Sequence, residues 1–282
     1  MKIVKRILIG LAAVILVFLV VLYAGSEWVI RAGHATPEVK IAVPSDAASV
    51  EEGARLARVA GCRSCHGKDG EGTVMVDSAM LGRIAPPPLA KIAATYSNED
   101  LVRAIRHGQR KDGSALWIMP SARSYHFIAD DDLGKIIGWI RTLKPGPKDS
   151  QATMRFGPLG RGLILFGGFH SSYTATSAAA KTRPANVGQY FVDAICMDCH
   201  SLSKELPAHD GSGMVPALAP MAASYDLPNF TKLMRTGQGM SGRDLGLMRR
   251  VAANDFRYFT DAEIASLHAY LAGEHAKLNG GK

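Results

Sequence analysis

The chain has 282 residues, of which 47% are hydrophobic and 21% are charged, and these proportions exclude a disordered chain and are typical of a globular protein. Its length allows two small domains, and its formal net charge of +8 would suit an anionic surface. The basic residues are scattered along the sequence, which contains no helix-turn-helix, zinc-finger or aromatic-basic motif, so we expect no nucleic-acid partner.

The first 25 residues are the first predicted element. Lys2, Lys5 and Arg6 precede an uninterrupted apolar run from Ile7 to Gly25, and about 20 such residues cross a hydrocarbon core roughly 30 Å thick. Basic residues before the run and few after it place the chain from Ser26 onward outside the cytoplasm. We expect residues 1–25 to be a single-pass anchor in the bacterial inner membrane, with the remainder in the periplasm. A cleaved secretory signal is the alternative, and it also implies export.

The rest of the chain contains an internal repeat. Residues 87–119 align without a gap on residues 216–248, and the identical pairs include Arg106 with Arg235 and Met119 with Met248. A repeat of this kind indicates a duplicated domain. We expect a linker at 26–47, a first domain at 48–145, a connector at 146–185 and a second domain at 186–278.

Hydrophobic periodicity predicts three helices in each copy. They are Glu51 to Ala60, Asn98 to Arg106 and Asp130 to Leu143, then Val187 to Ile195, Leu227 to Arg235 and Asp261 to His275. No convincing alternating pattern of the kind that predicts strands is present, so the predicted fold class is all-α. The connector carries an apolar island, Leu159 to Phe169, which is too short to span a membrane. We expect it to pack as a connector rather than to lie as an interfacial helix.

Two C-x-x-C-H motifs occur, at Cys62, Cys65 and His66 and at Cys196, Cys199 and His200. Two thiols three positions apart can reach the two vinyl groups of one haem while the following imidazole faces the iron, and this spacing is the attachment signature of c-type haem. A redox-active pair needs no following histidine, and a zinc site would need two more ligands beside each pair. We therefore expect two covalently bound haems c, which use all four cysteines of the chain.

The sixth ligand of each iron must come from elsewhere, and methionine and histidine are the usual donors. Met119 and Met248 stand at equivalent positions of the repeat, which favours them. The rivals are Met240 or Met234 for the second haem and His126 or His107 for the first. None of these rivals recurs in both copies.

Each ligating imidazole is also expected to donate its second N–H to a carbonyl, which fixes the ring and strengthens the ligand. Pro87 and Pro216 follow the two motifs at equivalent positions. Their carbonyls are the candidate acceptors for His66 and His200.

At these residues the chain resembles the class I cytochrome c family, and specifically tandem dihaem cytochromes with a membrane anchor. The resemblance covers roughly 48–145 and 186–278, and it includes Met119-Pro120, Tyr125 and a last helix with Trp139 or Tyr270. It implies two tandem all-α cytochrome domains with iron ligands His66 and Met119, then His200 and Met248. The second copy departs from the pattern, since Met248 is followed by Arg249 and not by proline.

The resemblance also implies an electron carrier rather than an enzyme. Such proteins pass electrons from a membrane or periplasmic dehydrogenase, or a quinol-oxidising complex, to a terminal oxidase or a soluble carrier. The alternative is a haem enzyme with one open iron, such as a dihaem peroxidase or a sulfur-compound oxidase. An enzyme of that kind needs an open iron, a distal acid-base group or a cysteine ligand, and no cysteine is spare.

Overall fold

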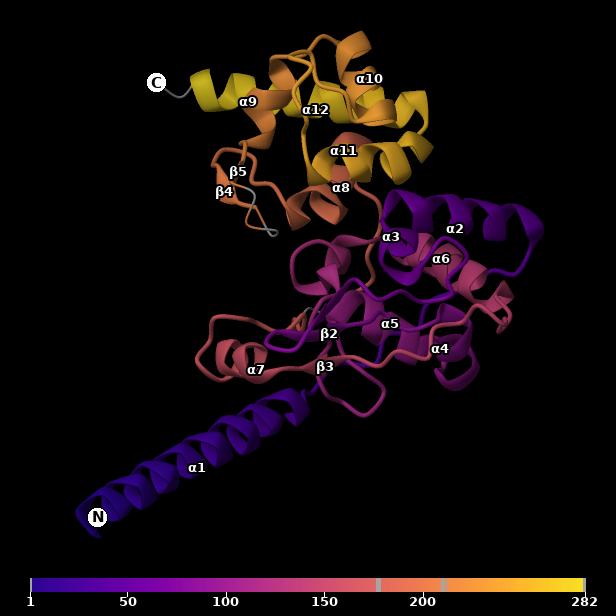
Figure 1. The fold of residues 1–282 in the computed structure, drawn as a ribbon. Helices are drawn as coiled ribbons and strands as arrows, with labels where there is room; N and C mark the ends of the chain where they lie inside the picture. Colours follow the sequence, from indigo (N-terminus) through magenta and orange to yellow (C-terminus); the bar gives the residue numbers. More distant parts are fainter. Residues whose placement is uncertain (1, 176–178, 209–210, 212, 281–282) are drawn as a thin grey trace.

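The computed structural model describes residues 2–175, 179–208, 211 and 213–280; the other residues, which include parts of the expected connector and second domain, lie outside this description. The described chain is mainly helical, as the sequence predicts. A long helix, α1 (Lys2–Arg31), projects from a body in which two helical halves lie one above the other (Figure 1).

Helix α1 is long and apolar enough to cross a membrane, by length and composition. It continues beyond Gly25, where the sequence places the end of the anchor, and Glu27 and Arg31 form an ion pair of 2.5 Å in this extension. Leu22 and Ser26 are buried where α1 contacts α7 (Pro158–Leu165). The last turns of α1 are therefore part of the folded body.

The six helices predicted from periodicity are all present, but the first begins four residues before its predicted start and the last extends five residues beyond its predicted end. The first half contains α2 (Ala47–Val59), α3 (Cys62–His66), α4 (Leu89–Thr95), α5 (Asn98–His107), the 3-10 turns η1 (Pro120–Ala122) and η2 (Tyr125–Phe127), and α6 (Asp130–Thr142). The second half contains α8 (Val187–Ala194), η3 (Cys196–Asp198), α9 (Leu218–Ala223), α10 (Leu227–Thr236), α11 (Leu247–Asn254), η4 (Phe256–Tyr258) and α12 (Asp261–Gly280). Each of the last helices buries an apolar stripe, Leu133, Ile136, Ile137 and Ile140 in α6 and Ile264, Leu267 and Leu271 in α12.

The described residues also include five short strands that the sequence did not predict. β1 (Val76–Ser78), β2 (Gly82–Ile84) and β3 (Arg155–Phe156) form an antiparallel sheet, and β4 (Leu206–Pro207) pairs with β5 (Met214–Val215). Strands of two or three residues are too short to show the alternation by which strands are recognised. The sheet fixes the connector to the first half, because β3 belongs to the connector.

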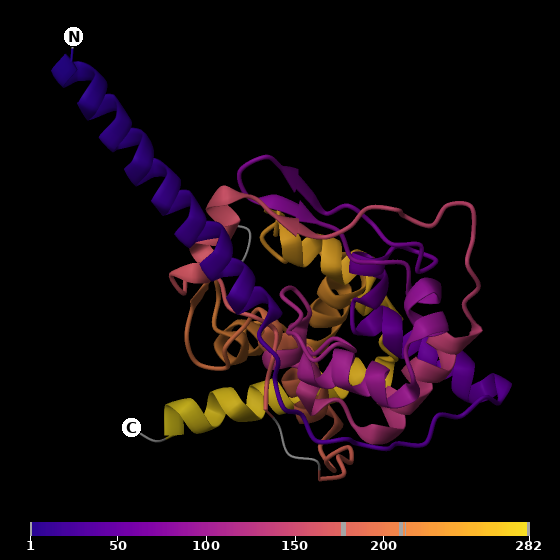
Figure 2. The same cartoon turned by 90° about the horizontal axis from the view of Figure 1, so that it is seen from below.

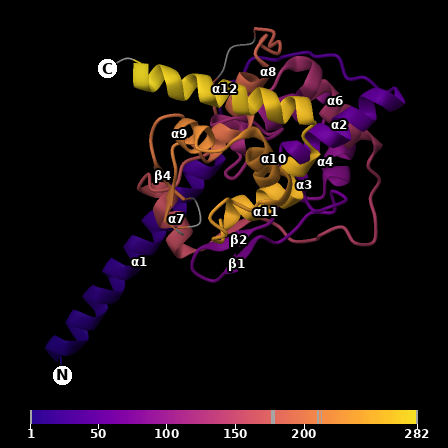
Figure 3. The same ribbon diagram turned by 90° about the horizontal axis from the view of Figure 1, so that it is seen from above.

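Each half is built on a crossing of its first and last helices, α2 on α6 and α8 on α12. Helix α12 is seen along its whole length in Figure 3. A Cβ atom on Gly53 would lie 2.0 Å from the carbonyl oxygen of Lys135, and one on Gly188 would lie 2.1 Å from that of Ser266. Glycine is therefore required at both crossings, and the duplication extends to the packing.

The repeated arginines have equivalent partners. Arg106 donates from Nη2 to Oδ1 of Asp130, and Arg235 donates from Nη2 to Oδ1 of Asp261, both at 2.6 Å. Each aspartate is the first residue of the last helix of its half. The recurrence of these arginines in the sequence thus reflects a shared link between the middle and the last helices.

The two halves are joined by one continuous hydrophobic core and by polar contacts. Arg55 of α2 donates two hydrogen bonds of 2.9 Å to the carboxylate of Glu263 of α12. Arg183 of the connector pairs at 2.6 Å with Asp132 of α6, and the hydroxyl of Tyr190 donates to the same carboxylate. The connector itself runs from α6 along the edge of the first half to β3 and α7 (Figure 2). The halves are packed together as one body.

Candidate functional site

The first C-x-x-C-H motif forms a single helical turn. Gly61, with a φ of 75°, separates α2 from the turn Cys62–His66. Downstream, the hydroxyl of Thr73 donates to the carbonyl of Cys65 at 2.6 Å, and the amide of Gly72 donates to the carbonyl of His66 at 2.7 Å. The turn is therefore held at both ends by short-range contacts.

Both histidines of the motifs make the hydrogen bond predicted from the sequence. Nδ1 of His66 lies 2.8 Å from the carbonyl oxygen of Pro87, and Nδ1 of His200 lies 3.0 Å from that of Pro216. Since a carbonyl only accepts, Nδ1 carries the hydrogen and Nε2 keeps its lone pair. In the described part of the chain no hydrogen bond involves either Nε2. Burial lowers the pKa of both imidazoles, so each is a neutral potential metal ligand at neutral pH.

The four cysteines are free thiols, each half-buried. Burial raises the pKa of Cys62, Cys196 and Cys199 to about 12, and it also raises the pKa of Cys65. A redox-active C-x-x-C pair depends on a lowered pKa, so these thiols do not fit that chemistry. Nor do the described residues contain a group of three or more His, Cys, Asp or Glu side chains that could hold a metal ion. Two thiols beside one neutral imidazole do fit covalently attached haem.

The two equivalent methionines have different local structures. Met119 precedes the 3-10 turn η1, which begins at Pro120, whereas Met248 lies in the first turn of α11. The absence of a proline after Met248 allows the α-helix to start there. Both side chains are half-buried and pack against the shared core.

The rival ligands have other environments. Met240 is 55% exposed, and Met234 is buried within the core at 3%. His107 is fully buried, with Nδ1 3.2 Å from the carbonyl oxygen of Thr174. Nδ1 of His126 lies 2.9 Å from the carbonyl oxygen of Ser121.

Each motif also contacts the other half of the molecule, and these contacts were not predicted from the sequence. The hydroxyl of Ser64 lies 2.7 and 2.8 Å from the two carboxylate oxygens of Asp255, which is only 3% exposed. Burial raises the pKa of Asp255 to about 6. In the other direction, Arg123 donates to the carbonyl of Asp198, inside the second motif, at 3.2 Å. No sequence signal links residues so far apart.

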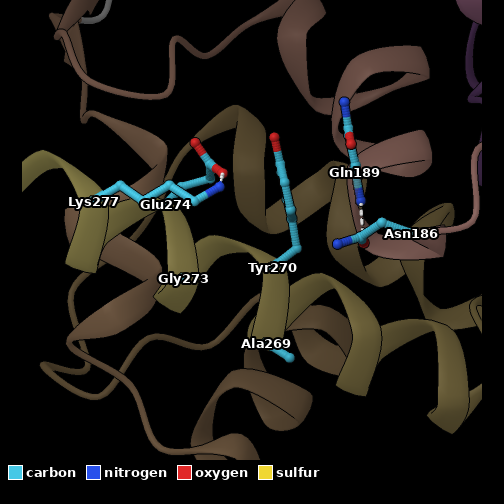
Figure 4. Close-up of a pocket in the computed structure, with 7 residues that line it drawn as sticks. All are labelled: Asn186, Gln189, Ala269, Tyr270, Gly273, Glu274 and Lys277. Carbon is cyan, nitrogen blue, oxygen red and sulfur yellow. Dashed lines mark hydrogen bonds and ion pairs between the residues drawn. The ribbon is translucent and has the colours of Figure 1, made fainter.

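A surface hollow between α8 and α12 lies outside both motifs. Figure 4 shows its lining, in which Glu274 pairs with Lys277 at 2.7 Å. The other lining residues are Asn186, Gln189, Ala269, Tyr270 and Gly273. This lining contains no cysteine, histidine or methionine, so the hollow is separate from the candidate site.

Comparison with known proteins gives a consistent result. The family model described as "Cytochrome c" matches residues 50–144. The chain is 31% identical over 94 residues to cytochrome c-554(548) of Halomonas halodenitrificans. This match covers 33% of this chain and 92% of that protein.

Longer relatives match both halves. The chain is 26% identical over 272 residues to the fructose dehydrogenase cytochrome subunit of Gluconobacter japonicus, with 83% of this chain and 54% of the relative covered. It is 25% identical over 271 residues to the gluconate 2-dehydrogenase cytochrome c subunit of Pantoea cypripedii, with 82% and 60% covered. The chain thus spans between half and two thirds of the length of these relatives. Matches that span more than four fifths of this chain extend over parts of both halves.

Proposed function

This chain belongs to the cytochrome c family, and we propose that it binds two haems c covalently and transfers electrons from a dehydrogenase to a respiratory acceptor. The observation that carries the proposal is the recurrence of one arrangement in both halves: two free thiols and an imidazole that donates from Nδ1 to a proline carbonyl. The proposed attachment and ligand residues are Cys62, Cys65, His66 and Met119 for one haem, and Cys196, Cys199, His200 and Met248 for the other.

The residues around each motif suit an electron carrier. A bound haem supplies a one-electron couple, and the protein binds, orients and electrostatically tunes it. The carbonyls of Pro87 and Pro216 hold the imidazoles in the tautomer whose Nε2 is free to ligate. If Met119 and Met248 supply the remaining ligands, these residues would leave no position for a substrate on either iron. The relatives are accordingly named as cytochrome subunits of dehydrogenases.

The proposed electron donor is the catalytic subunit of a membrane dehydrogenase that oxidises a sugar, a sugar acid or an alcohol. This class follows from the relatives, which are named as subunits of fructose, gluconate and alcohol dehydrogenases. The proposed acceptor is a terminal oxidase or a soluble carrier. We place α1 across the bacterial inner membrane and the haem domains on its periplasmic side, since α1 has the length and composition of a membrane span.

The packing of the two halves supports transfer between the proposed haems. One core and several ion pairs hold the halves together, and each motif contacts the opposite half through Ser64 or Asp198. Electrons would therefore pass between sites held in a constant geometry, without a domain motion.

The test is the visible and near-infrared spectrum of the holoprotein, with carbon monoxide added to the reduced form. We expect low-spin haems, a weak methionine-to-iron band and almost no carbon monoxide binding. Met119→Leu and Met248→Leu should each create one carbon monoxide-binding haem, and Met240→Leu, the exposed control, should create none. A high-spin, ligand-binding haem in the unmodified protein would contradict the proposal of an electron carrier and favour a haem enzyme with an open iron.

A further inference from the structure

Helix α7 has one buried and one exposed apolar face. Gly160 and Ile164 are buried. Leu159 and Leu163 of the helix and Phe166, the residue that caps its end, are four and then three residues apart and are exposed by 48%, 39% and 75%. Residues at this spacing share one face of a helix, so three large apolar side chains point outward together. The apolar island is therefore only partly packed, and its exposed apolar residues lie on one face.

The turn between β1 and β2 extends this apolar face. Met80 and Leu81 are 57% and 45% exposed. The turn is bound to the start of α7, because the amide of Leu159 donates to the carbonyl of Met80, and the amide of Gly157 to that of Leu81, both at 3.0 Å. The exposed apolar residues of the two segments are thus held next to each other.

Helix α7 is also fixed against α1. Arg161 donates to the carboxylate of Glu27 at 2.8 Å and to the hydroxyl of Ser26 at 3.0 Å, and its guanidinium lies 5.0 Å from the ring of Tyr23. A Cβ atom on Gly25 would lie 3.1 Å from Leu165, so the two helices touch closely. Figures 1 and 2 show α7 beside the carboxyl-terminal end of α1.

The contact with α1 fixes the depth of α7 relative to a bilayer. Counted from Ile7, a hydrocarbon core of roughly 30 Å ends after about 20 helical residues, near Ser26. Arg161 binds α1 at this level. If α1 spans the bilayer, α7 lies at the boundary between acyl chains and headgroups, where amphipathic helices bury their apolar faces by roughly 5–10 Å.

We propose that the outward face of α7 and the Met80-Leu81 turn insert into the outer surface of the bilayer that α1 crosses. The cytochrome body is then docked on the lipid in one orientation instead of swinging on a tether. This inference rests on the membrane anchoring included in the proposed function. A lipid surface is favoured as the occupant because Arg161 of the same helix binds Ser26 of α1, at the level where the expected membrane span ends.

The experiment uses the full-length oxidised holoprotein in vesicles of phosphatidylcholine and phosphatidylglycerol. A nitroxide label is placed on one added cysteine in each variant, Leu163→Cys on α7 or Phe166→Cys at the residue that follows it. Val17→Cys in the middle of α1 reports on the anchor, and Leu278→Cys, an apolar and 45% exposed position on α12, is the water-exposed control. The haem content of each variant checks that the native cysteines are occupied.

Power saturation then compares collisions with oxygen, which concentrates in lipid, and with a water-soluble nickel chelate. We expect the labels at 163, 166 and 17 to be accessible to oxygen and shielded from nickel, and the label at 278 to be accessible to nickel. Nickel access at 163 and 166 with a shielded label at 17 would overturn the inference and leave the anchor intact. If the labels at 163 and 166 are shielded from both reagents, the face is covered by a second copy of the chain, and the lipid proposal is wrong. Nickel access at 17 would refute the anchor itself.

Discussion

The hydroxyl of Ser64 donates a hydrogen bond to the carboxylate of Asp255, and it thereby joins the first C-x-x-C-H motif to the opposite half of the molecule. Asp255 follows α11, and the first turn of α11 contains Met248, the proposed ligand of the second iron. One short segment therefore contacts the first C-x-x-C-H motif at its end and contains the proposed ligand of the second iron near its start. Mutations of Asp255 are thus informative about both sites.

The first prediction concerns the reduction potentials. Above pH 6, where Asp255 is ionised, this buried carboxylate next to Cys62 and Cys65 would favour the more positively charged ferric state, so Asp255→Asn should raise the potential of the haem proposed there. An interaction of about 1 kcal/mol per electron corresponds to roughly 40 mV, so a shift of tens of millivolts is expected. A redox titration checks it. The control Glu51→Gln, which removes an exposed charge from α2, should not measurably shift the reduction potential of either haem. If Asp255→Asn shifts the reduction potentials of both haems equally, Asp255 does not act mainly on the haem proposed at Cys62 and Cys65.

The second prediction concerns the pH dependence of stability. Burial raises the pKa of Asp255 to about 6 from an ordinary value of 3.8, so the folded state holds this proton more tightly than the unfolded state. The resulting stabilisation is complete below pH 3.8 and is lost as the pH rises through 6. Denaturant unfolding should show this decline in the wild type. In Asp255→Asn, which keeps the hydrogen bond from Ser64, the decline should be smaller by about 2–3 kcal/mol at most. An unchanged pH profile would show that Asp255 does not titrate in this range.

The third prediction concerns the helix crossings. Gly53→Ala and Gly188→Ala should each destabilise the fold by about 3 kcal/mol, because the added methyl group meets a backbone carbonyl that cannot move independently. Gly273→Ala is the matched control, since a Cβ atom there meets nothing within 4 Å in α12. It should stabilise the helix by about 0.5–1 kcal/mol. Thermal unfolding measures all three, and similar losses in all of them would disprove the close approach.

The fourth prediction concerns the contact between the halves. In Glu263→Gln, Arg55 loses its charged partner across the interface, whereas the amide can still cap α12 through Thr260. The expected loss is about 1–3 kcal/mol of unfolding free energy, because Glu263 is only 7% exposed. Glu274→Gln, which removes an ion pair with the exposed Lys277, should cost less than about 0.5 kcal/mol. If the two variants lose the same free energy of unfolding, the pair between the halves stabilises the fold no more than an exposed ion pair does.

Much of the fold could be predicted because the duplication repeats each signal. The stripe containing Leu133 and Ile137 on α6 and the stripe containing Ile264 and Leu267 on α12 were recognisable by helical spacing, and all four residues are at most 1% exposed. The C-x-x-C-H motifs were recognisable because covalent haem attachment sets the spacing from thiol to imidazole. Their proline acceptors were recognisable because they stand at equivalent positions of the repeat. Short α4 and α9 lack enough residues for a periodic pattern.

The contacts between the halves could not be predicted in the same way. Ser64 and Asp255 are separated by 191 residues, and nothing in either local sequence indicates that they meet. The close approach at Gly53 also depends on the crossing of two helices, so the glycine has no distinctive sequence context. Similarly, the apolar island was expected to be a packed connector, but half of its helix packs on α1 and half is exposed.

The central claim, two covalently attached haems on one chain, is tested most directly by the haem content per chain after denaturation. We expect two haems in the unmodified protein, and one in each of the double variants Cys62→Ala/Cys65→Ala and Cys196→Ala/Cys199→Ala. The residual spectra of these two variants should add up to that of the unmodified protein. A single covalent haem in the unmodified protein, lost in only one of the variants, would contradict the account.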